Sequence, residues 1–122
     1  MADYPTITGT AFGSITVGDE TYDKDIYILA DGQVKKRKKK LAKAVYGTSH
    51  QIGPDELERV CRGGPEMVFI GTGQQGVTEL TPEGKRYLEK RRIDYAALPT
   101  PDMLVSYNKC DQRKAALIHV TC

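Results

Sequence analysis

The sequence predicts an α/β fold: a single domain with a mixed central β-sheet flanked by helices and an N-terminal antiparallel meander. Two observations support this prediction. The first third of the chain has short apolar–polar alternation broken by tight turns, and the remainder repeats a helix-then-strand order. The 122 residues, 39% of them apolar, suit one domain over residues 1–122, in which residues 1–8 are expected to form a flexible N-terminus.

The meander is predicted from three short segments. The expected strands cover residues 12–17, 22–29 and 33–38. Gly18-Asp19 and Asp31-Gly32 mark the tight turns between them. Val34 is the one apolar residue among the lysines of the third strand, which favours a strand at the edge of the sheet. A loop is expected over residues 46–53.

Three prolines mark the starts of the later helices. Pro54, Pro82 and Pro101 each precede an acidic residue, which suits the free N–H groups and the positive end of a helix. Thr81 and Thr100 are the expected N-caps. The three units pair helices over 55–61, 83–91 and 102–110 with strands over 67–70, 94–98 and 115–120. This order favours a mostly parallel arrangement in this part of the sheet.

The composition and the cysteine count limit the cellular location and the kinds of site that can be expected. No stretch approaches the roughly 20 apolar residues of a membrane span, and the N-terminus lacks the pattern of a signal peptide. A cytoplasmic protein without a membrane span is therefore expected. Cys61, Cys110 and Cys122 are odd in number and far apart, so neither a Cys-x-x-Cys metal clip nor a complete disulfide framework is available. The sequence predicts no metal site and no cofactor.

The most informative motif is a glycine-rich segment after the apolar run 67–70. It has the spacing G-x-G-x-x-G and consists of Gly71, Thr72, Gly73, Gln74, Gln75 and Gly76. Such a turn can leave backbone N–H groups free at the carboxyl end of a strand, where small ligands bind in α/β folds. A dinucleotide site is disfavoured, because Gly76 does not open a helix directly and the nearest acid, Asp94, is expected at the start of its strand. A structural turn and a ligand- or partner-binding loop both remain open.

The C-terminal strand carries a second candidate cluster. Alternation places His119 and Thr121 on one side of the strand, near the thiol of Cys122. These three residues join the glycine loop as ligand-binding candidates. His119 and Cys122 need not meet, however, and His50 is expected in a loop. Since no acid that could orient either histidine is evident by spacing, no catalytic residue is predicted.

Basic residues are concentrated in one run. It contains Lys35, Lys36, Arg37, Lys38, Lys39, Lys40 and Lys43, while acids outnumber basic residues in the rest of the chain. Such a run can contact a polyanion. We favour a solvated edge strand, because no aromatic residue interrupts the run to stack on bases. Binding of nucleic acid through these residues is the less favoured alternative.

Several segments resemble a small α/β family of unknown function related to mitochondrial respiratory complex I assembly factor 3 and to an adipogenesis-associated vertebrate protein. The resemblance covers about residues 8–122. It rests on Phe12-Gly13-Ser14-Ile15, on Tyr22 with Asp25-Ile26, on the run from Glu66 to Gln74, and on the ending from Ala116 to Cys122. It implies a compact α/β domain with a mixed sheet and no established catalytic residues. The lysine run is richer in lysine than the family pattern.

Two classes of function follow from these observations. The favoured one is a non-enzymatic binding or assembly module that presents the glycine loop to a protein partner or a small ligand. The alternative is a small enzyme with a pocket at this loop, in which Gln74, His119 or Cys122 polarises a substrate. The oligomeric state is not predicted.

Overall fold

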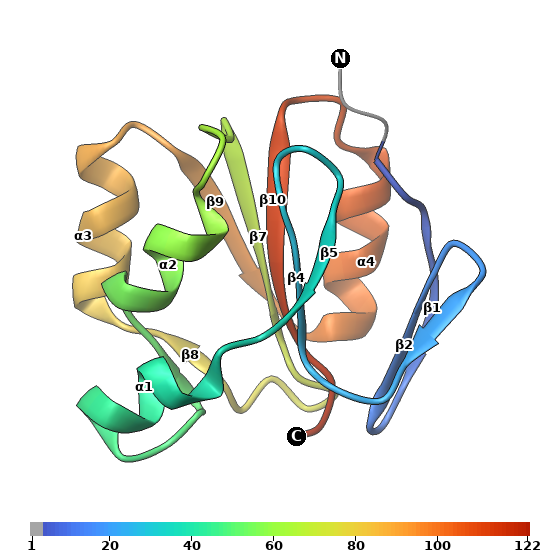
Figure 1. Cartoon of the computed structure of the whole chain (residues 1–122), viewed down its shortest axis with the longest axis horizontal. Helices are drawn as coiled ribbons and strands as arrows, with labels where there is room; N and C mark the ends of the chain where they lie inside the picture. Colours follow the sequence, from blue (N-terminus) through green and yellow to red (C-terminus); the bar gives the residue numbers. More distant parts are fainter. Residues whose placement is uncertain (1–3) are drawn as a thin grey trace.

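A computed structural model describes residues 4–122 and has a five-stranded mixed sheet at its centre (Figure 1). The strands are β1 (Ile7–Ala11), β2 (Ser14–Val17), β3 (Glu20–Tyr22), β4 (Ile26–Ile28), β5 (Val34–Lys36), β6 (Gln51–Ile52), β7 (Met67–Thr72), β8 (Glu79–Leu80), β9 (Asp94–Leu98) and β10 (Lys114–His119). The helices are α1 (Lys39–Tyr46), α2 (Pro54–Val60), α3 (Pro82–Lys90) and α4 (Thr100–Lys109). The predicted α/β class and the antiparallel N-terminal sheet are both confirmed.

The central sheet has the strand order β5-β4-β10-β7-β9. Strand β7 pairs in parallel with both β10 and β9, whereas β4 pairs antiparallel with β10 and with β5. The lysine-rich strand β5 therefore lies at one edge, as predicted. The separate sheet β1-β2-β3 is antiparallel throughout, and β6 and β8 form a short parallel pair.

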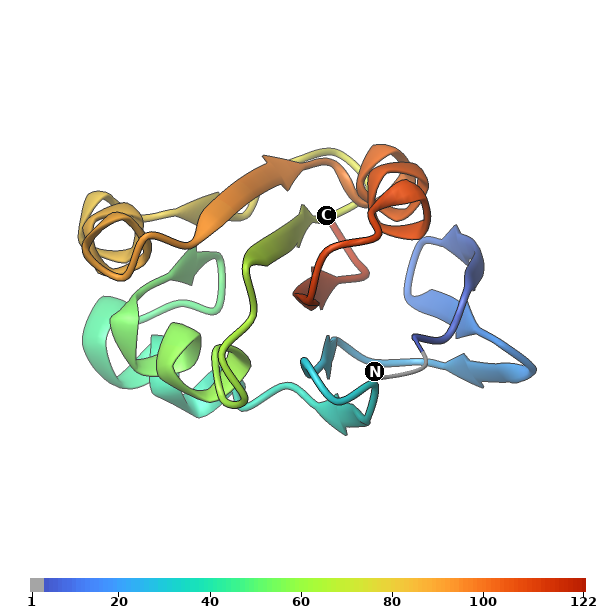
Figure 2. The same ribbon diagram turned by 90° about the horizontal axis from the view of Figure 1, so that it is seen from above.

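Apolar side chains fill the spaces on both faces of the central sheet. On one face, α2 and α3 cover a core that includes Leu57, Leu88 and Leu117. On the other face, α4 and the β1–β2 hairpin cover a core that includes Ile15 and Tyr107 (Figure 2). Successive residues of β10 alternate between these two cores. No helix among residues 4–122 has the length and apolar character needed to cross a membrane.

Several elements differ from the sequence-based prediction. Strand β1 and helix α1 were not expected, and the strand predicted over 22–29 is divided into β3 and β4. Thr100 is not an N-cap but the first residue of α4, because the N–H groups of Asp102 and Met103 already donate to the Pro99 carbonyl, both at 2.9 Å. The Thr100 hydroxyl instead donates to the His119 carbonyl at 2.6 Å and accepts from the Gly73 N–H at 3.0 Å. Of the expected flexible residues 1–8, residues 1–3 lie outside the described part, and Ile7 is buried at the start of β1.

The strand directions bring distant segments to one edge of the sheet. Because β7 and β10 are parallel, their carboxyl ends lie together, and His119 is opposite Thr72. Since β4 is antiparallel to β10, the residue before β4, Asp25, lies at this same edge. The chain leaving β5 also starts here, and the Arg37 N–H donates to the Asp25 carbonyl at 3.0 Å. This edge holds the candidate functional site.

We predict that Thr81→Ala lowers the free energy of unfolding by about 1–2 kcal/mol. The Thr81 hydroxyl accepts from the Gly84 N–H at the start of α3 and donates to the Ile52 carbonyl, both at 3.0 Å. Urea denaturation monitored by circular dichroism measures the change. Thr81→Ser keeps the hydroxyl and should recover most of the stability; equal losses in both variants would contradict the capping role.

Candidate functional site

A buried guanidinium lies at the centre of the site. Arg37 is 3% exposed and contacts two carboxylates that are themselves buried. Its Nη1 lies 2.9 Å from Oδ2 of Asp25, and its Nε and Nη2 lie 2.9 and 2.7 Å from the two oxygens of Glu56. Nη2 also donates to the Ser49 carbonyl at 2.8 Å. The two-pronged contact with Glu56 uses the planar fork that distinguishes arginine from lysine.

The carboxylates keep this network charged. Burial lowers the pKa of Arg37, but the hydrogen bonds and charges of Glu56 and Asp25 outweigh burial and raise it. The Tyr27 hydroxyl donates to Oε2 of Glu56 at 2.6 Å, and burial together with the Glu56 charge raises the pKa of Tyr27. Tyr27 therefore serves Glu56 as a neutral donor.

Asp25 links the guanidinium to His119. Its Oδ2 lies 2.7 Å from Nδ1 of His119, and its Oδ1 accepts the Val120 N–H at 2.9 Å. Burial raises the pKa of Asp25, but the hydrogen bonds from His119, Val120 and Arg37 outweigh burial and lower this pKa to about 2. An ionised carboxylate can only accept, so Nδ1 carries the proton that faces Asp25.

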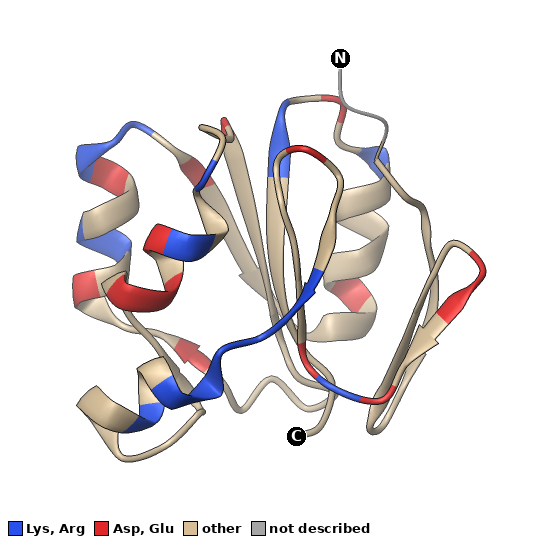
Figure 3. Cartoon of the chain, in the orientation of Figure 1, with Lys and Arg blue, Asp and Glu red and all other residues tan. Residues whose placement is uncertain are grey.

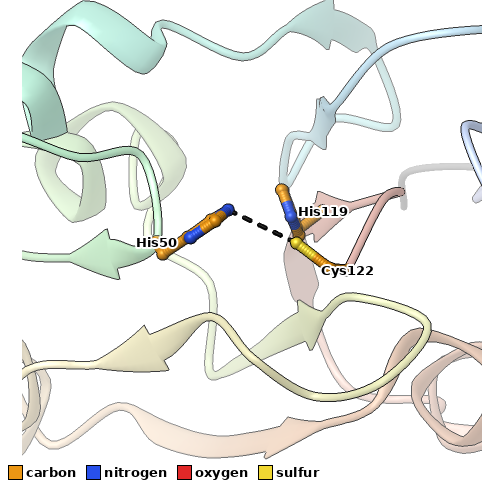
Figure 4. Close-up of side chains that lie close together, drawn as sticks. All are labelled: His50, His119 and Cys122. Carbon is orange, nitrogen blue, oxygen red and sulfur yellow. Dashed lines mark hydrogen bonds between the residues drawn. The ribbon is translucent and has the colours of Figure 1, made fainter.

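The opposite ring nitrogen of His119 faces a second group of residues. Its Nε2 lies 3.0 Å from the Thr121 hydroxyl. The His50 ring meets the His119 ring edge to face, with centroids 5.3 Å apart, and Nε2 of His50 lies 3.6 Å from Sγ of Cys122. In Figure 4 both imidazoles and the thiol converge on one point, from the segment before β6 and from the end of β10. The structure thus brings together His119, Thr121 and Cys122, and adds His50.

The glycine loop holds the backbone of this cluster. The N–H of Gln74 donates to the Thr121 carbonyl at 2.7 Å, and the N–H groups of Gln75 and Val77 donate to the Cys122 carbonyl at 3.3 and 3.1 Å. Further along, the Glu79 N–H donates to the His50 carbonyl at 3.0 Å. The segment from Gln74 to Glu79 therefore holds the backbone of Cys122, which carries the thiol, and the backbone of His50, which carries the second imidazole.

The rest of the loop is also engaged by the protein. The Gly73 N–H donates to the Thr100 hydroxyl, and the Gly76 N–H donates to the Gly73 carbonyl at 3.3 Å. The Gln74 side-chain amide contacts Thr10 Oγ1 and the carbonyls of Ala11 and Val120. The N–H groups expected to be free for a ligand thus have acceptors within the chain. Gln75 and Gly76 border a shallow surface hollow beside β8.

Glycine is required at position 73 by conformation and by space. Its φ is +103°, and a Cβ built there would lie 2.4 Å from the Cys122 carbonyl carbon. The close approach is what allows the loop to wrap residues 120–122. Gly71 is also confined, since a Cβ there would lie 2.9 Å from the Thr100 hydroxyl.

The basic run is divided between the interior and the surface. Arg37 is buried in the ion-pair network, so its guanidinium is not available to a polyanion. The other members of the run are exposed or half-buried: Lys35, Lys36, Lys38, Lys39, Lys40 and Lys43. Lys39 Nζ lies 3.7 Å from Oδ2 of Asp25, at the outer side of the network.

Sequence reasoning did not identify three members of the site. Asp25 is 94 residues from His119 along the chain, and Glu56 is 19 residues from Arg37. Tyr27 joins them from the buried strand β4. One available signal was Asp25 itself, a carboxylate directly before the apolar strand Ile26–Ile28; the single arginine among lysines was another.

We predict that Gly73→Ala destabilises the fold more than Gly18→Ala does. Both glycines have positive φ, so each alanine costs about 1–2 kcal/mol in backbone strain. Gly18 has open space around it, whereas Gly73 faces the Cys122 backbone, which should add about 1–3 kcal/mol. Chemical denaturation of the two variants measures the difference. Equal destabilisation would show that the loop does not need the close approach.

A second prediction concerns acid. The pKa of Asp25 is lowered in the folded protein from 3.8 to about 2, so its contribution to stability is present above about pH 4 and is lost as pH falls towards 2. This contribution is on the order of 2 kcal/mol. Urea titrations from about pH 6, where the contribution is complete, to about pH 2.5, where much of it is lost, should show a steeper decline for the wild type than for Asp25→Asn. Parallel declines would exclude Asp25 as a source of acid sensitivity.

Comparison with known proteins gives the family and the fold. Residues 7–119 match the model of a family described as a protein of unknown function (DUF498/DUF598). A conserved hypothetical protein, PH1505 from Pyrococcus horikoshii OT3, is 32% identical with a TM-score of 0.87, over 96% of this chain and 99% of that one. A protein called MT938 is 35% identical with a TM-score of 0.84, over 97% and 99% of the two chains.

A more distant structure shares the fold alone. A Bordetella pertussis protein described as an Mth938-like domain is 18% identical with a TM-score of 0.64, over 95% of this chain and 85% of that one. These likenesses agree with the predicted small, uncharacterised α/β family. The chain belongs to the DUF498/DUF598 family of proteins of unknown function.

Proposed function

We propose that the protein is a non-enzymatic binding module that docks an acidic segment of a partner protein on the surface formed by β5, α1 and α2. The observation that carries this proposal is a pair of adjoining hollows that share Lys36 and Lys38. The larger hollow, about 470 Å³, is lined by Lys24, Asp25, Lys36, Arg37, Lys38, Lys39 and Lys40. The smaller, about 190 Å³, is lined by Tyr27, Leu29, Lys35, Lys36, Lys38, Arg59 and Arg62.

The charge of this surface is largely uncompensated. Figure 3 shows a continuous band of basic residues from β5 into α1. Among residues 4–122, no carboxylate lies within 4.0 Å of the amino groups of Lys36, Lys38 or Lys40. The neighbouring carboxylate of Asp25 is already bound by Arg37 and His119. An acidic partner would therefore meet a positive potential.

An apolar groove beside the lysines favours a protein partner. Leu41, Val45 and Tyr46 of α1 and Pro54 of α2 line a hollow of about 270 Å³, and Val45 is 59% exposed. Asp55, Glu56 and Glu83 also line this hollow, so an apolar side chain of the partner suits it better than an acidic one. The same helix thus offers lysines for charge and an apolar surface for an anchoring side chain. Nucleic acid is less favoured, because Tyr27, the aromatic residue that lines the smaller basic hollow, is buried and hydrogen-bonded to Glu56.

The proposal keeps the binding module predicted from sequence but moves its binding surface. The N–H groups of Gly73, Gln74, Gln75 and Gly76 donate to Thr100, Thr121, Cys122 and Gly73 within the chain, whereas the lysine surface has uncompensated charge. The sequence resembles a family of unknown function, and we propose that this family is related to a complex I assembly factor. Such a relationship supports a function exerted through protein contacts.

The test uses the whole chain and a fluorescent synthetic peptide with Glu on one helical face and Leu on the other. Lys36→Gln/Lys38→Gln/Lys40→Gln should weaken binding about tenfold, since each exposed ion pair contributes about 0.5 kcal/mol. Lys85→Gln/Lys90→Gln/Lys109→Gln removes equal charge from exposed positions elsewhere and should change binding far less. Fluorescence anisotropy, repeated at increasing salt, measures both effects.

Val45→Ser tests the apolar part of the surface without adding a charge beside the lysines. It should weaken the Glu/Leu peptide but leave the binding of poly-glutamate nearly unchanged. Equal peptide binding by the two triple variants would contradict the proposed surface. Preference for a duplex oligonucleotide over the peptide, abolished by the first triple variant, would instead favour the nucleic-acid alternative.

A further inference from the structure

Two imidazoles and a thiol form a cluster that the docking surface does not use. The ligand atoms of His50, His119 and Cys122 all lie within 4.8 Å of one another. His119 is buried, and His50 and Cys122 are half-buried. We propose that these three residues form a Zn²⁺ site with a fourth position open to water or an added ligand.

The chemistry of the three donors suits zinc. Two neutral imidazoles and one thiolate are a borderline-soft set of the kind that Zn²⁺ prefers, and three protein ligands with an open fourth position are typical of reactive zinc sites. Bond lengths of about 2.05 Å to nitrogen and 2.3 Å to sulfur place tetrahedral N and S ligands about 3.6 Å apart. Nε2 of His50 and Sγ of Cys122 are already 3.6 Å apart.

Asp25 supplies the outer partner of a metal-bound histidine. Its carboxylate lies 2.7 Å from Nδ1 of His119, which leaves Nε2 as the nitrogen with a free lone pair. A carboxylate that holds the far nitrogen of a ligating imidazole fixes its tautomer and increases its basicity. Nε2 is the atom that faces the Thr121 hydroxyl, so metal binding requires this hydroxyl to turn away.

The charge closest to His119 is that of the Asp25 carboxylate, 2.7 Å from its Nδ1. Asp25 and Glu56 are both buried and share one guanidinium, that of Arg37. Lys39, whose Nζ lies 3.7 Å from Oδ2 of Asp25, balances the remaining negative charge, so the network as a whole is neutral. A divalent cation held by His119 would interact most directly with the Asp25 carboxylate across the imidazole.

The fold holds the ligands in place without the metal. The glycine loop fixes the backbone of Cys122, and Glu79 fixes that of His50. The largest separation, 4.8 Å, is wider than a tetrahedral edge, so the half-buried side chains must close in by about 1 Å. Because the backbones of His50 and Cys122 are held by these hydrogen bonds, the adjustment is a rotation of their half-buried side chains.

The test is metal binding to the whole protein after treatment with a chelator. Zn²⁺ affinity is measured by competition with a chromophoric chelator, and Co²⁺ is used as the spectroscopic probe. The wild type should bind one Zn²⁺ per chain, and its Co²⁺ form should show the thiolate-to-cobalt charge-transfer band and the intense visible bands of tetrahedral cobalt.

The variants separate this site from other thiols and imidazoles. Cys122→Ser should abolish the charge-transfer band, and His50→Ala should weaken Zn²⁺ by more than the 10–100-fold typical for loss of an outer partner. Cys110→Ser, which changes a half-buried thiol far from the cluster, should leave both unchanged. Thr121→Val should not weaken binding, because it removes the competing hydroxyl.

Far-ultraviolet circular dichroism of each metal-free variant establishes that it is folded. Three results would overturn the proposal: no stoichiometric Zn²⁺ uptake by the wild type, a Co²⁺ spectrum without a thiolate band, or equal affinity in folded wild type and Cys122→Ser. None of these results depends on the lysine surface, so the metal site and the proposed docking function are tested separately.

Discussion

The contact between Arg37 and the carboxylates of Asp25 and Glu56 is the interaction on which the arrangement of the site depends. It joins the chain leaving β5 to the start of β4 and to the first turn of α2, and Asp25 extends it to the end of β10. A buried charge without its partner is strongly destabilising, typically by about 3–5 kcal/mol. These segments must therefore assemble together, and the position of His119 is set by the same contacts that satisfy Arg37.

This constraint explains why one basic residue points inward from a run of lysines. The planar guanidinium satisfies two carboxylates and a carbonyl at once, which a lysine amino group could not do with the same geometry. With Arg37 anchored, neighbouring lysines emerge on the surface at the outer side of the network. Structural and surface roles thus alternate within a single stretch of charge.

The sequence predicted the elements whose signals are local. Pro54, Pro82 and Pro101 with their following acids located three helices, and the strand 94–98 has the predicted bounds. Helix α1 was obscured because lysine, a good helix former, also suits an exposed edge strand. The contact between Asp25 and His119 could not be read from spacing, because it depends on β4 being antiparallel to β10, a choice made by the whole sheet.

The glycine loop shows why a motif can be located correctly while its role stays open. A glycine-rich turn after a buried strand has the same local requirements, positive φ and a close backbone approach, whether it surrounds a pyrophosphate or another part of the chain. The difference lies in what accepts the N–H groups, and here residues 121 and 122 supply the carbonyls. These residues come shortly after His119 in the chain. The hydrogen bonds from the loop therefore determine where the backbone that carries Cys122 lies relative to His50 and His119. The motif therefore acts on the site by positioning its backbone.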